Sequence, residues 1–144
     1  MPSVTIGQQN LLQEGAILEV LFLVPTKIEE DLKKEGKEVP KGIPAKALID
    51  TGASSCSLKD SIPTSLGLTP VGTVTVKTPN SSNHQAYEYF MRMYIPALNL
   101  IYEDVFIAMP LEEQPIHSLL GRNLLSNGIF IYLGISNQFT LSLL

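Results

Sequence analysis

The sequence predicts a mainly β fold with one or two short helices, formed as a single domain over residues 1–144. Apolar runs of strand length recur along the chain, and the strongest, residues 16–24, lies between a glycine and a proline, as buried strands often do. Residues 71–95 alternate in polarity around a dense turn signal, which predicts a long hairpin. Helix signals are short and few, so strands carry most of the predicted fold.

Composition and charge narrow the class of protein. With 144 residues, 44% hydrophobic and 17% charged, the chain has a globular composition and enough length for a buried core. A net charge of -4 without a basic cluster argues against nucleic acid as a partner. One cysteine, Cys56, and two histidines, His84 and His117, allow no disulfide within the chain and exclude a metal site built on several cysteines. We therefore expect no metal and no cofactor.

Neither export nor membrane attachment is predicted. The longest apolar run, residues 20–24, is far too short to span a bilayer, and the N-terminus lacks the charged-then-apolar order of a signal peptide. We expect a cytoplasmic protein with no membrane partner.

In the N-terminal half, strands are predicted at residues 4–6 and 16–24, with a polar turn between them, and at residues 45–52. Residues 54–67 are expected to be irregular, with one helical turn at residues 63–66.

A charged insertion, residues 26–41, separates the second and third of these strands. Its first part, residues 26–36, predicts a short exposed helix in which Thr26 is the N-cap and Glu29 completes a capping box. Gly36 suits the helix end, and the charged side chains are expected to form a solvated face.

In the C-terminal half, the hairpin over residues 71–95 is followed by predicted strands at residues 98–109, 129–133 and 138–143. Cys56 is expected to be a small core residue, because free cysteine is often buried and no base lies beside it in sequence. His117 is isolated, which favours a structural or surface role.

Asp50 stands out because an apolar run, residues 47–49, brings it to the point where a strand ends and a tight turn begins. Thr51, Gly52 and Ala53 follow at once. A carboxylate there is costly to desolvate unless it has partners, and the chain's other three aspartates lie in charged or polar surroundings. An Asp-Thr-Gly tripeptide alone is a modest signal, since it occurs by chance in roughly a few per cent of chains of this length.

A second motif, Leu-Leu-Gly-Arg-Asn at residues 119–123, follows Asp50 by about seventy residues. An apolar strand with Asp-Thr-Gly-Ala, a hairpin, and an apolar-apolar-Gly motif that opens a short helix occur in this order in the retropepsin-like aspartic peptidases, single-domain relatives of pepsin. Over roughly residues 45–144 the chain resembles this family, and most of all its bacterial type. The resemblance implies a closed β-barrel in which the hairpin forms a flap.

The resemblance also implies roles for the motif residues. Asp50 would be the catalytic residue, and Thr51 would join two copies of the loop by hydrogen bonds. Gly52 would let the backbone approach the substrate, and Ala53 would keep the neighbouring subsite small. The flap tip would comprise Thr78, Pro79, Asn80, Ser81 and Ser82. The residues that would support the loop from the second motif are Gly121, Arg122 and Asn123.

Two departures from the viral members of the family bear on these roles. Ser54 occupies the position of an acidic residue that in those enzymes pairs with the arginine of the second motif, so Arg122 needs another partner. The predicted flap tip also lacks their glycines, which leaves its contacts with substrate open.

Aspartic proteolysis needs two carboxylates close enough to share one proton, and this chain supplies one Asp-Thr-Gly. A symmetric homodimer that pairs Asp50 with its copy is the simplest completion. We therefore expect an aspartic endopeptidase with a peptide or protein substrate. Two alternatives remain: a catalytically weak module of the same fold that binds peptides or mediates dimerisation, and a plain β-barrel with a chance Asp-Thr-Gly.

Overall fold

A computed structural model describes residues 1–77, 83–111 and 115–144 of the chain. The strands are β1 (Ser3–Gly7), β2 (Ile17–Leu23), β3 (Ile43–Ile49), β4 (Ser57–Lys59), β5 (Gly72–Lys77), β6 (Asn83–Ile95), β7 (Leu100–Met109), β8 (Ser118–Leu120), β9 (Gly128–Leu133) and β10 (Gln138–Leu143). The helices are α1 (Leu11–Glu14), α2 (Thr26–Lys34), α3 (Ser61–Ser65) and α4 (Arg122–Leu125), with 3-10 turns η1 (Pro96–Leu98) and η2 (Gly134–Ser136). The predicted mainly β class is confirmed.

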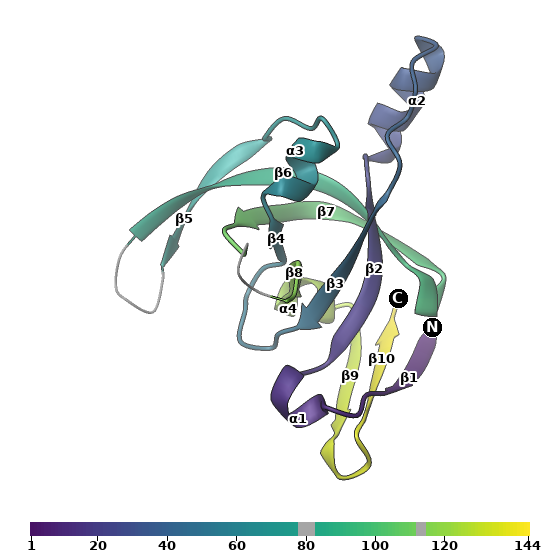
Figure 1. The fold of residues 1–144 in the computed structure, drawn as a ribbon, viewed down its shortest axis with the longest axis vertical. Coiled ribbons are helices and arrows are strands. Elements are labelled where there is room, and N and C mark those ends of the chain that lie inside the picture. The colour runs from purple at the N-terminus through teal and green to yellow at the C-terminus, as the bar shows by residue number, and fades with distance from the viewer. Residues whose placement is uncertain (78–82, 112–114) are drawn as a thin grey trace.

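A barrel forms the centre of the molecule. One sheet has the strand order β2-β3-β8-β4-β7-β6-β5, and a further pairing of β2 with β6 closes six of these strands into a ring. β5 stays outside the ring as the outer arm of the β5–β6 hairpin, which extends to one side in Figure 1. The pairs β3–β8 and β4–β7 are parallel. The expected closed β-barrel is therefore confirmed.

The two ends of the chain form a second sheet, in the order β1-β10-β9, with antiparallel pairing throughout. The two termini lie close together in Figure 1. One face of this terminal sheet packs on the barrel, because Phe139 and Leu141 of β10 are fully buried in the same cluster as Phe22 and Phe106. The rings of Phe22 and Phe106 meet edge to face with centroids 5.5 Å apart, a favourable aromatic arrangement.

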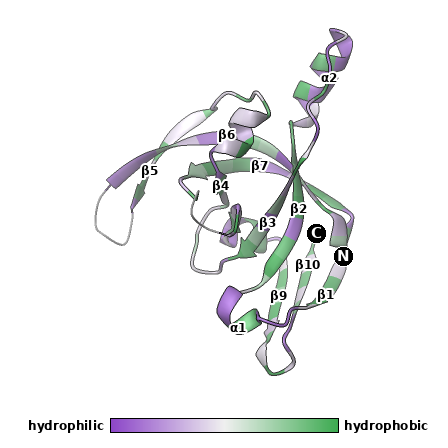
Figure 2. Ribbon diagram, in the orientation of Figure 1, coloured by the Kyte–Doolittle hydropathy of each residue, from purple (hydrophilic) through white to green (hydrophobic). Residues whose placement is uncertain are grey.

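The predicted exposed helix is confirmed as α2, which projects from the barrel and has no buried residue (Figures 1 and 2). Its predicted cap is wrong, because Pro25 is the N-cap and no side chain caps the helix. Thr26 instead donates from both its backbone N and its Oγ1 to Glu103 Oε1, at 2.7 Å each. Glu29 pairs with Arg92 Nη2 at 3.0 Å, so this carboxylate fixes the helix to the barrel and does not belong to a purely solvated face.

Several element boundaries also differ from the sequence prediction. The short helix α1 replaces a predicted polar turn, and β4 and α3 occupy most of the region expected to be irregular. Cys56 is fully buried, as predicted, and so is Leu58. β3 begins earlier than predicted and ends at Ile49, so Asp50 lies in the turn and not within the strand.

The predicted flap tip, residues 78–82, lies outside the described residues. Within the described ranges, none of the helices has the length and apolar character needed to cross a membrane.

Candidate active site

Asp50 is positioned by the end of β3 and by the neighbouring strand β8. Ile49 pairs with Leu120 in a parallel register, and the next backbone N–H, that of Asp50, donates to the Leu120 carbonyl at 2.9 Å. Ala47 and Ile49 point into the core, with 0% and 7% exposure. Asp50 itself is half-buried, so its carboxylate sits at the boundary between the core and solvent.

A tight turn follows, and it orients the carboxylate. The backbone N–H of Gly52 donates to Asp50 Oδ1 at 2.9 Å, and the N–H of Ala53 donates to the Asp50 carbonyl at 3.2 Å. A Cβ at position 52 would lie 3.1 Å from Asp50 Oδ1, so a larger residue there would crowd the carboxylate. Thr51 and Gly52 are exposed. The turn thus places the Asp50 carboxylate next to the solvent-exposed backbone of Thr51 and Gly52.

The second motif packs directly behind this turn. The backbone N–H of Arg122 donates to the Ala53 carbonyl at 2.8 Å, and that of Asn123 donates to the Ser54 carbonyl at 3.2 Å. A Cβ on Gly121 would lie 2.6 Å from the Ser55 carbonyl oxygen and 2.9 Å from that of Ala53. Only glycine allows the two segments to approach this closely.

The Arg122 side chain makes a further contact with the Asp50 turn. Its Nη1 donates to the Thr51 carbonyl at 2.7 Å. A serine at position 54 has no negative charge to offer an arginine, and the carbonyl of Thr51 provides the acceptor instead. The guanidinium group therefore reaches the residue that follows Asp50.

Comparisons with known proteins agree with this arrangement at the level of the fold. No protein-family model matches the sequence, and no curated protein matches it either. Among solved structures, the chain is similar to a retropepsin-like aspartic protease from Rickettsia conorii, with a TM-score of 0.55 over 96% of this chain and 89% of that one. The chain has a retropepsin-like fold. The sequence identity of 20% extends the likeness to the fold and no further.

Within this retropepsin-like fold, the Cys56 side chain connects the segment after the Asp50 turn to the second motif. Its Sγ donates to Asn123 Oδ1 at 3.2 Å and accepts a hydrogen bond from the Gly121 N–H at 3.4 Å. Burial raises the pKa of the Cys56 thiol, which favours the protonated form that can donate to Asn123. Sequence reasoning placed Cys56 in the core but missed these bonds, because no local pattern connects residues 65 or more positions apart.

Asp104 is the other half-buried aspartate of the barrel, and its carboxylate already has partners. Tyr102 Oη donates to Asp104 Oδ2 at 2.8 Å, and the Val105 N–H donates to Oδ1 at 2.7 Å. Burial, together with this carboxylate, raises the pKa of the Tyr102 phenol above its ordinary value, so the phenol stays a donor. Asp104 therefore has a structural role on β7.

A cavity of about 280 Å³ adjoins the Asp50 turn. It separates the turn from the last residues of β5, the outer arm of the hairpin. Its lining residues are Gly52, Ala53, Ser54, Ser55, Ser57, Val76, Lys77, Ile107, Met109 and Leu119.

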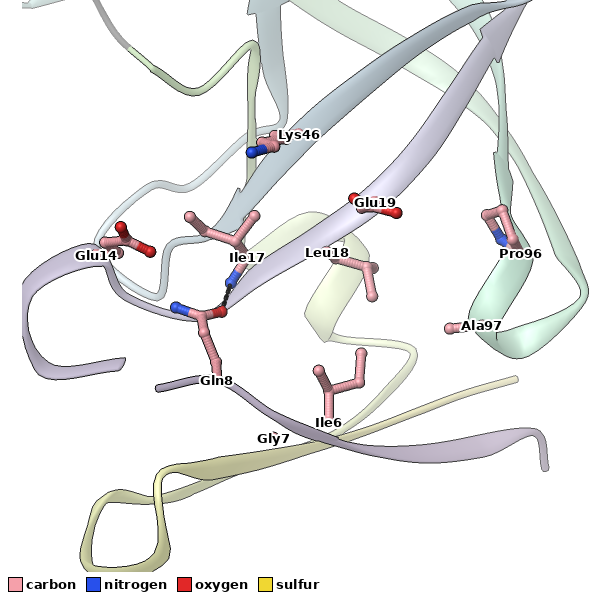
Figure 3. A pocket seen from close by; sticks show the side chains of 10 residues that line it. All are labelled: Ile6, Gly7, Gln8, Glu14, Ile17, Leu18, Glu19, Lys46, Pro96 and Ala97. Carbon is pink, nitrogen blue, oxygen red and sulfur yellow. Dashed lines mark hydrogen bonds between the residues drawn. The ribbon is translucent and has the colours of Figure 1, made fainter. Parts of the chain in front are cut away.

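A larger cavity of about 430 Å³ lies away from this turn, between the terminal sheet and β2 (Figure 3). Gln8 lines this cavity, and its side-chain Oε1 accepts a hydrogen bond from the Ile17 N–H at 3.0 Å. Glu14 and Glu19 lie on opposite sides of Ile17 in Figure 3, so they do not form a carboxylate pair. Across the described ranges, no three or more His, Cys, Asp or Glu side chains gather as a metal site.

Proposed function

We propose that the protein is an aspartic endopeptidase whose active site forms when Asp50 meets its copy across a homodimer. The observation that carries this proposal is the Asp50 turn itself. One carboxylate, oriented by the Gly52 N–H and supported by the second motif, faces an exposed backbone surface. The likeness of the fold to a retropepsin-like aspartic protease supports the same chemistry.

Hydrolysis then follows from two carboxyl groups that share one proton. Like charges about 3 Å apart cannot both ionise, so one member of the pair is protonated while the other is a carboxylate. The carboxylate takes a proton from a water molecule, which attacks the peptide carbonyl carbon. The protonated member donates a hydrogen bond to the carbonyl oxygen and stabilises the charge that develops there.

The residues around Asp50 acquire roles in this proposal. Thr51, whose side chain is exposed at the turn, would donate hydrogen bonds to the partner's copy of the turn. Gly52 and Ala53 leave room for an extended peptide next to the carboxylates. The β5–β6 hairpin would act as a flap and bind that peptide by strand addition.

The outer face of the terminal sheet supports a second copy as the partner. Ile129 and Ile131 of β9 point outward and are 53% and 46% exposed. The residues that complete their rows across β10 and β1 are Ser142, Ser3, Thr140 and Thr5. These hydroxyls bond to one another in pairs, at 2.6 and 2.8 Å, and the rows carry no charge. A two-fold axis places such a face against itself, and a face without charge, whose hydroxyls are already paired, tolerates that contact.

Replacement of Asp50 by asparagine tests the proposal. Asparagine keeps the shape of the side chain but cannot act as the base, so cleavage of an unfolded protein substrate should fall by at least about 10²-fold. The circular dichroism spectrum and the mass in solution should not change. Asp60→Asn is the matched control, because Asp60 is exposed and lies outside the turn.

Undiminished, specific cleavage by the Asp50→Asn variant would contradict the catalytic assignment. A wild-type protein that binds peptides but cleaves none would instead favour a catalytically weak module of the same fold.

A further inference from the structure

Ser57 occupies an unusual position in the cavity beside the Asp50 turn. By register it lies between Ile107 of β7 and Leu119 of β8, and all three residues line the cavity. Its neighbour Leu58 points to the opposite side, into the core. Ser57 is therefore the polar residue in the centre of a wall that is apolar on both sides.

The Ser57 hydroxyl has no hydrogen-bond partner among the described residues, although the residue is only 6% exposed. A buried hydroxyl without a partner is unfavourable, because it has lost its bonds to water. The buried serine on the adjacent strand differs in this respect, since Ser118 Oγ donates to the Ser57 carbonyl at 2.6 Å. Because Ser57 shares its side of the sheet with Ile107 and Leu119, its side chain belongs to the cavity side.

The other residues that line the cavity limit which ligand group could form a hydrogen bond with the Ser57 hydroxyl. Apolar surface comes from Ala53, Val76, Ile107, Met109 and Leu119. The other polar side chains of the lining, those of Ser54, Ser55 and Lys77, belong to residues that are at least partly exposed to solvent. A neutral side chain with an apolar body and one hydrogen-bonding group fits these walls. The Ser57 oxygen is covered in the structure, so a bond to a ligand in the cavity requires the hydroxyl to rotate about the Cα–Cβ bond to another staggered position.

We propose that this cavity is a substrate subsite that selects threonine over valine through the Ser57 hydroxyl; this inference rests on the proposed function. Threonine and valine have nearly the same shape, so the apolar walls accept both. Only threonine offers a hydroxyl that can exchange a hydrogen bond with Ser57. A site built to bond a substrate hydroxyl disfavours the analogue that lacks it, because a buried polar group then stays unpaired.

The test uses pairs of peptides that differ only by threonine or valine, placed in turn at each position around the cleaved bond. At one position the wild type should cleave the threonine peptide with a kcat/KM about tenfold higher, a factor of the size that one hydrogen bond gives. Ser57→Ala should remove this preference, so that the ratio of kcat/KM for the threonine and valine peptides falls to about one. Ser55→Ala is the matched control, because Ser55 lines the same cavity but is partly exposed, and it should keep the preference.

Binding provides a second readout that does not need turnover. The Asp50→Asn variant, with and without Ser57→Ala, is titrated with the same peptides, and the ratio of Kd values for the threonine and valine forms is compared. Cleavage that depends on Asp50, with a threonine-to-valine ratio that Ser57→Ala does not change at any position, would overturn this inference alone. An absence of Asp50-dependent cleavage would overturn the proposed function, and the Kd ratio would still decide the role of Ser57.

Discussion

The Asp50 turn and the terminal sheet differ in how far a single chain satisfies them. The backbone carbonyls of the turn have hydrogen-bond partners within the chain, whereas one face of the terminal sheet stays uncovered. At the turn, backbone bonds from Arg122 and Asn123 and the guanidinium of Arg122 satisfy the carbonyls of the loop. On the terminal sheet, one face is buried in the core while Ile129 and Ile131 lie open on the other. The support of the proposed site is thus internal, whereas the second carboxylate and the cover for the terminal sheet would both come from another copy.

The largest effect is expected from a charge on the outer face of the terminal sheet, which should weaken association of two copies. Ile131→Asp places two carboxylates together at the proposed two-fold interface and should weaken dimerisation by at least about 30-fold, which corresponds to a side chain worth about 2 kcal/mol or more. Cleavage should fall in parallel at low protein concentration, while urea unfolding of the monomer changes little. Sedimentation velocity over a concentration series measures the first effect.

Ile28→Asp is the control for this prediction, because Ile28 is also partly exposed but lies on the projecting helix α2. Equal weakening by both substitutions would show that the terminal sheet has no special part in association.

A methyl group behind the Asp50 turn should have the next largest effect. Gly121→Ala forces a Cβ to within 2.6 Å of the Ser55 carbonyl, so the two segments must separate. The free energy of unfolding should fall by about 1–3 kcal/mol, the usual cost of overpacking, and activity should fall with it. Gly7→Ala is the comparison, since a Cβ there meets nothing within 4 Å. Equal stability of the two variants in urea would refute the close approach.

His117 should give the smallest effect and a dependence on pH. Its Nδ1 accepts a hydrogen bond from the Lys46 N–H at 2.9 Å, which requires a neutral ring. Burial, and then Lys59 and Lys46, lower the pKa of His117 below its ordinary value of 6.5. The unfolded chain therefore binds the proton first as the pH falls below 6.5, and stability is lost until the pH has passed the lower pKa of the folded state.

The expected loss is at most about 1 kcal/mol, the net contribution of an ordinary hydrogen bond. Urea unfolding at pH 7 and pH 5 measures it, with His117→Asn as the control, because the asparagine oxygen can accept the same bond without titrating. An identical pH dependence of stability in the wild type and in His117→Asn would show that His117 does not cause the loss.

Local patterns predicted the parts of the structure that depend on local sequence. The apolar run before Asp50, the hairpin arms and the last two strands all lie within a few residues of their predicted positions. The strand β4 was missed because three residues carry too little periodicity to be recognised. The capping box at Thr26 failed because Glu103, 77 positions away, binds the same backbone N–H.

The same limit applies to the candidate site. The resemblance to the retropepsin-like family implied that the second motif supports the Asp50 turn, but the bond from Arg122 to the Thr51 carbonyl joins residues 71 positions apart and has no local signal. The unpaired hydroxyl of Ser57 could not be predicted either, because it depends on which side of a short strand faces the cavity.

The most direct test of an active site shared by two chains is to mix wild-type and variant subunits. Wild type at constant concentration is combined with increasing Asp50→Asn, allowed to exchange subunits, and assayed for cleavage. If each site needs two Asp50 carboxylates, activity should fall to about one half with an equal amount of the variant and to about one quarter with a threefold excess, as random pairing requires. The double variant Asp50→Asn, Ile131→Asp should inhibit less, because even one carboxylate buried at the interface weakens the mixed dimer. Activity that stays constant as Asp50→Asn is added would contradict the shared site.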